Sequence, residues 1–288
     1  MTNKKKILSL CLILIHNNNA ERYKHIRPAL DKLCVNLSQI YKVEIKEISY
    51  RPEIILHSTL MTIQREVLHW RLSREWCKYC HVKVPFILND AGYFLINNFN
   101  NSFRLQEGFA LKKRKRNSFR ETVITANHIL AWNAFVKSDS DFMICFEDDA
   151  VFKEDSIQRV KELLDTLSRY PPNTLIYVDL AGGCEYSTLK IDALEIKWDS
   201  AFKYYSKPVT NTACSYLISK PLARLFVETV NMNPKLRTIR SDWLMNKIFI
   251  MAAYNELKCT CMHAVPSIFK HGSVTGEYYS LMSPDRNG

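Results

Sequence analysis

The sequence has 288 residues, 47% of them hydrophobic, so it is long enough to bury one large core or two small ones. Its formal net charge of +11 favours an anionic partner, such as nucleic acid, a phosphorylated ligand or an acidic membrane surface. Nine cysteines, an odd number scattered along the chain, argue against a disulfide framework and for a reducing compartment.

The first segment resembles a signal peptide, because a basic start precedes an apolar run from Ile7 to Ile15. That run is far shorter than the roughly 20 residues that span a bilayer, and no convincing small-residue cleavage site follows it. We therefore interpret it as a buried first strand. No other stretch is long and apolar enough to predict a membrane helix.

The opening of the chain predicts a strand, a helix and a second strand. Ile7–Ile15 is continuously apolar, Ala20–Leu37 has apolar residues at helical spacing, and Tyr41–Tyr50 alternates apolar and polar residues. This order is consistent with a βαβ unit. The following stretch is less regular, with a helical pattern at Ile55–Trp76 and a hairpin signal around Asn89–Gly92.

The second half of the chain continues the alternation of strands and helices, which predicts an α/β sheet covered on both faces. Asp155 is expected to cap a helix, with Gln158 in a capping-box position. The predicted elements are a helix at Glu121–Ser138, a strand at Phe142–Phe146, a helix from Asp155 to Pro171, a strand within Thr174–Gly183, a strand at Val209–Ser219, a helix from about Pro221, a helix at Ser241–Glu256, and a strand and loop at Thr260–Ser273.

Three consecutive acids, Glu147, Asp148 and Asp149, follow the strand predicted at Phe142–Phe146. In open α/β sheets, ligands bind beyond the carboxyl ends of the strands. Because strand side chains alternate, Glu147 and Asp149 should share one side. Adjacent carboxylates beside an apolar core need neutralisation, and their oxygens suit Mg²⁺ or Mn²⁺. The alternative interpretation is a solvated turn.

The stretch ANHILAWNAFVKSDSDFMICFEDDAVF resembles the central block of glycosyltransferase family 25, enzymes of lipopolysaccharide and lipooligosaccharide assembly. In that block a helix with a Ser-His step and a Trp precedes a strand ending in Glu-Asp-Asp. Here the helix supplies Asn127, His128 and Trp132, with Asn127 where the family commonly has Ser. LILIHNNNAERYKHI, TACSYLISKPLARLF and SDWLMNKIF are similar to the family's first strand and Arg-bearing loop, its Tyr-x-Ile-Ser segment and its aspartate-containing helix.

The resemblance implies a GT-A-like (Rossmann-like) mixed sheet with helices on both faces, in a single domain over 1–288 with an unmatched insertion at about 51–111. It implies metal-dependent, inverting transfer of a hexose, such as galactose, from a nucleotide sugar, usually UDP-linked, to a lipopolysaccharide-type acceptor. A divalent ion, Mn²⁺ or Mg²⁺, would stabilise the diphosphate leaving group. By the family pattern, Asp149 is the best metal ligand, and Glu147 would bind the metal or the ribose hydroxyls.

Further site residues are candidates from their positions in the sequence. His271, after the last predicted strand, is a candidate third metal ligand or an ordinary loop histidine. Asp242 is the candidate base that takes the acceptor proton, or else a helix cap. Trp132, four residues after His128, fits the core better than a sugar platform. The candidate donor-binding residues are Arg22, His128, Glu147, Asp148 and Lys270.

The basic run Lys112–Arg116 fits an anionic membrane surface or the phosphorylated core of a lipid-linked acceptor, or is a solvated loop. This favours a cytoplasmic protein, peripheral on the inner membrane. Nucleic-acid binding is disfavoured, because no recognisable aromatic module accompanies the run. A metal-dependent phosphoryl-bond hydrolase is the alternative enzyme class. A zinc site from Cys77, Cys80, Cys259 and Cys261 is also disfavoured, because the second pair is closely spaced.

Overall fold

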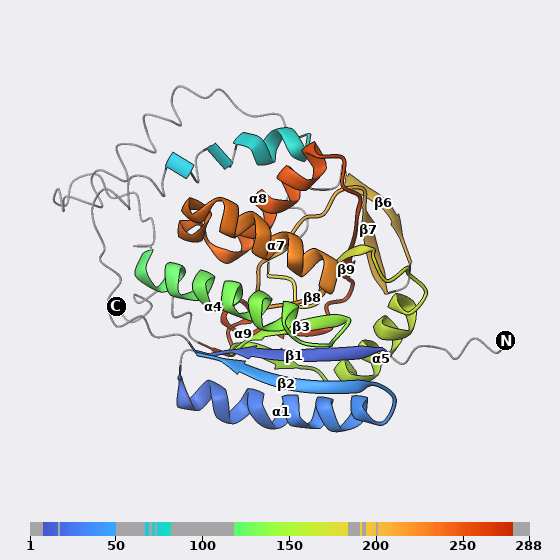
Figure 1. Ribbon diagram of the computed structural model, residues 1–288. Coiled ribbons are helices and arrows are strands. Elements are labelled where there is room, and N and C mark those ends of the chain that lie inside the picture. Colours follow the sequence, from blue (N-terminus) through green and yellow to red (C-terminus); the bar gives the residue numbers. More distant parts are fainter. Residues whose placement is uncertain are drawn as a thin grey trace.

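The computed structural model describes residues 8–16, 18–49, 67–68, 71–72, 74–81, 118–183, 191, 194–199 and 201–278 (Figure 1). The hairpin expected around Asn89–Gly92 and the basic run Lys112–Arg116 lie outside these residues, and the helix expected at Ile55–Trp76 is described only in part. None of the described helices is both long and apolar enough to cross a membrane.

A mixed sheet forms the centre of the described structure. Its strands are β1 (Ser9–Ile15), β2 (Lys42–Ile48), β3 (Phe142–Glu147), β5 (Leu175–Asp179), β6 (Glu195–Trp198), β7 (Phe202–Tyr205), β8 (Ser215–Ser219) and β9 (Cys259–Ala264). They lie in the order β2-β1-β3-β8-β5-β9-β7-β6. Strands β1, β2 and β3 are parallel, whereas β8 runs antiparallel to both β3 and β5. A smaller antiparallel sheet pairs β4 (Ala150–Phe152) with β10 (Phe269–His271).

Helices cover both faces of the large sheet, which confirms the α/β class (Figure 1). One face carries α1 (Ala20–Ser38) and α5 (Ser156–Leu167), and the other carries α4 (Ser118–Val136), α7 (Lys220–Met232) and α8 (Ser241–Tyr254). Alternate residues of β1 divide between the two cores, with Leu12 on the α1 side and Ile13 on the α4 side. The apolar run of β1 is continuous because both of its faces are buried.

Some boundaries differ from the sequence pattern. The strand expected at Val209–Ser219 begins only at Ser215, because the chain turns at Thr212, where φ is 76°. Asp155 occupies the N-cap position of α5, as expected, but its side chain makes no cap bond, so the expected capping box is wrong. Instead the hydroxyl of Ser156 accepts from the amide of Lys153 at 2.8 Å and donates to a backbone carbonyl.

The topology gathers several polar residues at one edge of the sheet. Because β3 and β5 both run antiparallel to β8, their carboxyl ends meet the amino end of β8. Glu147 ends β3, Asp179 ends β5, and Cys214 immediately precedes β8. The acid turn of β3 therefore lies beside groups that are distant in the sequence.

Candidate active site

The turn after β3 sends its first two carboxylates to opposite faces of the sheet. Oε1 of Glu147 lies 2.9 Å from Nε2 of His128 on α4. On the other face, Asp148 Oδ1 accepts a hydrogen bond from Arg22 Nη1 on α1 at 2.8 Å. Both members of this second pair are buried, so each neutralises a charge that burial would otherwise penalise. The alternation expected for a strand end accounts for this divergence.

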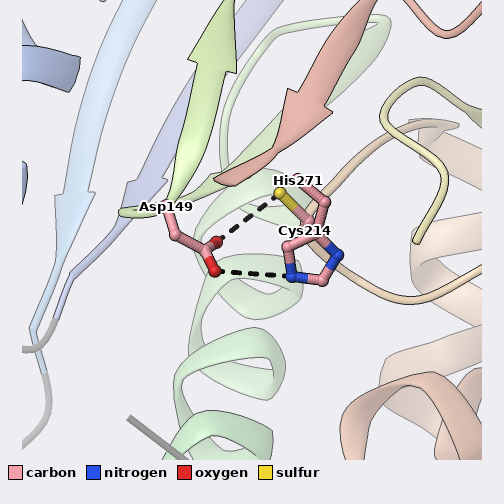
Figure 2. Close-up of side chains that lie close together, drawn as sticks. All are labelled: Asp149, Cys214 and His271. Atoms are coloured by element: carbon pink, nitrogen blue, oxygen red, sulfur yellow. Dashed lines mark hydrogen bonds and ion pairs between the residues drawn. The ribbon is translucent and has the colours of Figure 1, made fainter. Parts of the chain in front are cut away.

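The third carboxylate, Asp149, lies in a compact cluster with His271 and Cys214, whose side chains point toward it (Figure 2). Its Oδ2 atom lies 3.4 Å from Nε2 of His271 and accepts a 2.5 Å hydrogen bond from Ser273 Oγ. The thiol of Cys214 donates to Oδ1 at 3.5 Å. The backbone amide of Gly272 donates to the carbonyl of Asp149 at 2.9 Å, so the whole His-Gly-Ser step at the end of β10 packs on this residue.

The charges of Asp149 and His271 stabilise each other. Burial raises the pKa of Asp149, but His271 and Ser273 outweigh it and hold the pKa at about 2. Burial lowers the pKa of His271, yet the hydrogen bond and charge of Asp149 raise it above its ordinary value. Burial raises the pKa of the Cys214 thiol well above its usual range. The cluster thus favours a carboxylate and a protonated imidazole beside a neutral thiol.

Thr212 and Gly183 form a tightly packed wall against the ring of His271 and orient it. The hydroxyl of Thr212 lies 3.3 Å from Nδ1 of His271. Thr212 has φ of 76°, a left-handed conformation that is unusual for a β-branched residue. Gly183 lies against both side chains, because a Cβ atom there would come within 2.1 Å of Thr212 Cγ2 and 2.9 Å of His271 Nδ1. Only glycine fits this position without displacing the two.

Asp179 ties together the two turns that build this wall. Its Oδ1 accepts from the amide of Gly182 at 2.7 Å, and its Oδ2 accepts from the amide of Asn211 at 3.0 Å and from the hydroxyl of Tyr177 at 3.2 Å. Burial nevertheless raises its pKa to about 7 against these three hydrogen bonds. This buried carboxyl therefore has a structural part in the turn that follows β5.

The donor atoms of the cluster fit a divalent cation. Ligands about 2.0–2.3 Å from one ion lie about 3–3.5 Å apart. Oδ2 of Asp149 lies 3.4 Å from Nε2 of His271 and its Oδ1 lies 3.5 Å from Sγ of Cys214, and ligand atoms of the three residues all lie within 4.8 Å of one another. Carboxylate and imidazole together suit Mn²⁺, whereas Mg²⁺ prefers oxygen ligands and a thiolate favours Zn²⁺. Among the described residues, the possible cation cluster comprises Asp149, Cys214 and His271, and Glu147 lies outside it.

Two other candidate residues lie apart from this cluster. Asp242 is in the first turn of α8, where its side chain bonds the amide of the next residue and its carbonyl lies 3.4 Å from the hydroxyl of Thr210. Lys270 is exposed and pairs with Glu277 at 3.0 Å. The structure brings together Asp149 and His271 from the candidate metal ligands. From the candidate donor-binding residues it pairs Arg22 with Asp148 and His128 with Glu147.

Several residues at the site were not singled out by the sequence pattern. Cys214 sits in an apolar run and resembles a small hydrophobe, and Thr212 shows no sign of its backbone conformation. Ser273 follows His271 by two residues, and no sequence pattern marked it. Tyr216 belonged to the Tyr-x-Ile-Ser segment, but only the fold shows that its hydroxyl meets His128, at 2.9 Å.

Comparison with known proteins identifies the class of enzyme. The chain belongs to glycosyltransferase family 25, whose model, described as "Glycosyltransferase family 25 (LPS biosynthesis protein)", matches residues 17–245. The protein is therefore a glycosyltransferase, and the family implies a nucleotide-sugar donor and an oligosaccharide acceptor. The match spans the acid turn and Asp242 and ends before Lys270 and His271.

No curated protein matches the chain. Among solved structures, the chain is similar to a glycosyltransferase involved in the glycosylation of the major capsid of PBCV-1. The TM-score is 0.29 and the sequence identity 8%, over 78% of this chain and 68% of that one.

Proposed function

We propose that the protein is a metal-dependent, inverting glycosyltransferase of the GT-A type that moves a hexose, with galactose the first candidate, from a UDP-linked donor to a lipopolysaccharide- or lipooligosaccharide-type acceptor. The observation that supports this most directly is the cluster of Asp149 and His271 at the carboxyl edge of the sheet, in a chain of family 25. Family membership favours glycosyl transfer over a phosphoryl-bond hydrolase or a nucleic-acid-binding protein.

In this proposal Asp149 and His271 would hold a divalent cation, Mn²⁺ or Mg²⁺, with His271 giving up its second ring proton when the ion binds, and the ion would supply Lewis-acid charge against the leaving diphosphate. The Thr212 hydroxyl fixes the ring of His271 through Nδ1, as hydrogen-bond partners of the second ring nitrogen do for metal-binding histidines. Ser273 holds one oxygen of Asp149 through its 2.5 Å hydrogen bond.

Glu147 is the candidate donor-binding residue best placed to meet the ribose hydroxyls or the ion, because 21% of its side chain is exposed. His128 holds it from α4. Arg22 and Asp148 are buried against each other and would shape the donor site by fixing the turn. Lys270 would have to leave Glu277 to pair with the donor diphosphate.

Asp242 is the proposed base. Inversion needs a carboxylate that takes the acceptor proton on the face opposite the leaving group. Asp242 is only half-buried, and its carbonyl is bonded by Thr210, two residues before the Thr212 that orients His271. One short connection thus links the first turn of α8 to the proposed metal ligands. The basic run Lys112–Arg116 is the proposed contact with an anionic acceptor core or membrane surface, at about 1 kcal/mol for each basic residue.

A thermal-shift screen of nucleotide sugars, with and without Mn²⁺, tests this proposal. We expect a UDP-hexose to stabilise the wild type only when Mn²⁺ is present, and Asp149→Ala to abolish that response. Asp155→Ala is the matched control, because Asp155 is exposed and makes no side-chain cap bond. A response that survives in Asp149→Ala would refute the metal assignment. Donor breakdown without transfer to any offered saccharide would point to hydrolysis instead.

A further inference from the structure

A buried chain of hydrogen bonds runs from α4 through β8 to the acid turn. The indole Nε1 of Trp132 donates to the hydroxyl of Tyr216 at 2.9 Å. That hydroxyl lies 2.9 Å from Nδ1 of His128, and Nε2 of His128 lies 2.9 Å from Oε1 of Glu147. Trp132, Tyr216 and His128 are fully buried, whereas Glu147 is partly exposed at the edge of the sheet.

The chemistry of the four groups gives this chain one direction. An indole nitrogen only donates, so the oxygen of Tyr216 accepts from Trp132 and its own hydrogen is left for another acceptor. An ionised carboxylate only accepts, so Nε2 of His128 carries a hydrogen and donates it to Glu147. In a neutral imidazole, Nδ1 is then the nitrogen that accepts the hydroxyl hydrogen of Tyr216.

We propose that Trp132 and Tyr216 are positioning residues that fix His128 in its Nε2–H tautomer and thereby aim the carboxylate of Glu147 into the donor site. With Oε1 held by His128, the second oxygen of Glu147 faces a defined direction. This deepens the proposed function and rests on it, since it assigns to the His, Trp and Tyr of the family-like segments one shared task at that site.

The tautomer is measurable without any activity. In a two-bond ¹H–¹⁵N spectrum of histidine-labelled wild-type protein, we expect the resonances of His128, assigned with His128→Gln, to show a protonated Nε2 and an unprotonated Nδ1. Tyr216→Phe, which removes the hydroxyl and keeps the ring, should shift His128 toward a mixture of tautomers. A protonated Nδ1 in the wild type, or an unchanged tautomer in Tyr216→Phe, would overturn the proposal.

Steady-state kinetics provide a second test of the proposal. Loss of a hydrogen bond that orients a site residue typically costs about 10–100-fold in activity, and we expect Tyr216→Phe to lose that much in kcat/KM for the donor with little change in KM for the acceptor. Tyr41→Phe is the matched control, because it also removes a tyrosine hydroxyl and its hydrogen bond, here to Asp165 at 3.0 Å, on the far face of the sheet. Its activity should equal that of the wild type.

Because Tyr216 is proposed to act through Glu147, the losses of activity caused by substituting each residue should not multiply. The double variant Tyr216→Phe/Glu147→Gln should be no slower than Glu147→Gln alone. Multiplicative losses, or a Tyr216→Phe rate equal to that of Tyr41→Phe, would show a merely structural tyrosine. If the wild type transfers no hexose at all, the proposed function fails. The tautomer measurement would still show whether Tyr216 fixes the tautomer of His128.

Discussion

The hydroxyl of Thr212 lies 3.3 Å from Nδ1 of His271, on a residue whose own φ is 76°. A left-handed conformation costs an L-residue about 1–2 kcal/mol, and this cost persists because the surrounding structure imposes it. Strain at this position is therefore coupled to the orientation of a proposed metal ligand.

Thr212→Gly should separate stability from activity. Glycine relieves about 1–2 kcal/mol of backbone strain and costs about 0.5–1 kcal/mol of chain entropy, so thermal stability should be equal or higher. Transfer activity and Mn²⁺ affinity should fall, because His271 loses its hydroxyl partner. Calorimetry and an activity assay measure the two effects. Thr212→Ser keeps the hydroxyl and should retain activity; equal activity in the glycine variant would contradict the orienting role.

Gly183→Ala should damage the same wall from the other side. The added methyl group would meet Thr212 Cγ2 at 2.1 Å and His271 Nδ1 at 2.9 Å, so one of them must move. We expect a loss of about 1–3 kcal/mol of stability, as for other overpacked sites, together with weaker Mn²⁺ binding measured by titration calorimetry. Gly276→Ala is the control: its Cβ meets nothing within 4 Å, so it should carry only backbone strain and leave Mn²⁺ binding intact.

The buried pair of Arg22 and Asp148 predicts a non-additive stability cycle. Arg22→Met should cost about 3–5 kcal/mol, because it leaves a buried carboxylate without its partner. Arg22→Met/Asp148→Leu should recover much of that loss, since neither charge is then left alone. Urea unfolding of both single variants and the double variant gives the coupling energy. Simple addition of the two losses would show that the pair is not coupled.

Much of this fold was predictable, because buried strands and helices place their apolar residues at regular spacings in the sequence. The apolar runs of β1 and β3 and the helical spacing of α1 and α5 marked elements near their observed positions. Strand β4 has three residues, and β6 reads Glu-Ile-Lys-Trp with its apolar side chains exposed, so neither leaves a clear trace. Asp149 was identifiable from its strand tip, whereas the place of Cys214 depends on the antiparallel insertion of β8, which no local pattern encodes.

Cys214 should influence which metal the cluster prefers. A thiolate ligand favours Zn²⁺ over Mn²⁺, so the wild type should bind Zn²⁺ more tightly than Mn²⁺. Cys214→Ser should weaken Zn²⁺ binding by more than tenfold and change Mn²⁺ binding much less, which competition titrations on metal-stripped protein would measure. An equal effect on both ions would place the sulfur of Cys214 outside the coordination shell.

His263 should make stability depend on pH. Its ring is fully buried, with Nε2 2.9 Å from the carbonyl of Val209, and burial lowers its pKa to about 4. Between pH 4 and its unfolded value of 6.5 the unfolded state binds the extra proton, so this residue makes stability rise with pH. Across that window the gain is about 3 kcal/mol.

Asp179 should make stability change with pH in the opposite direction to His263. Its pKa is raised from 3.8 to about 7, so between these values the native state holds the extra proton and stability falls as pH rises. In the wild type, the contributions of His263 and Asp179 to the pH dependence of stability offset each other. His263→Gln should therefore steepen the fall in unfolding free energy from pH 4.5 to 6.5, measured by urea titration. A slope identical to that of the wild type would show that His263 titrates normally.

The partners of Asp149 come from widely separated parts of the chain: Cys214 precedes β8, and His271 and Ser273 follow β9. A growing polypeptide released from the ribosome only as far as β9 could already pair β1, β2, β3 and β8. It would nevertheless lack two of the three side chains that surround Asp149. Assembly of the cluster around Asp149 thus waits for the segment that follows β9, and a chain that stopped directly after β9 could form the large sheet without the proposed metal ligand His271.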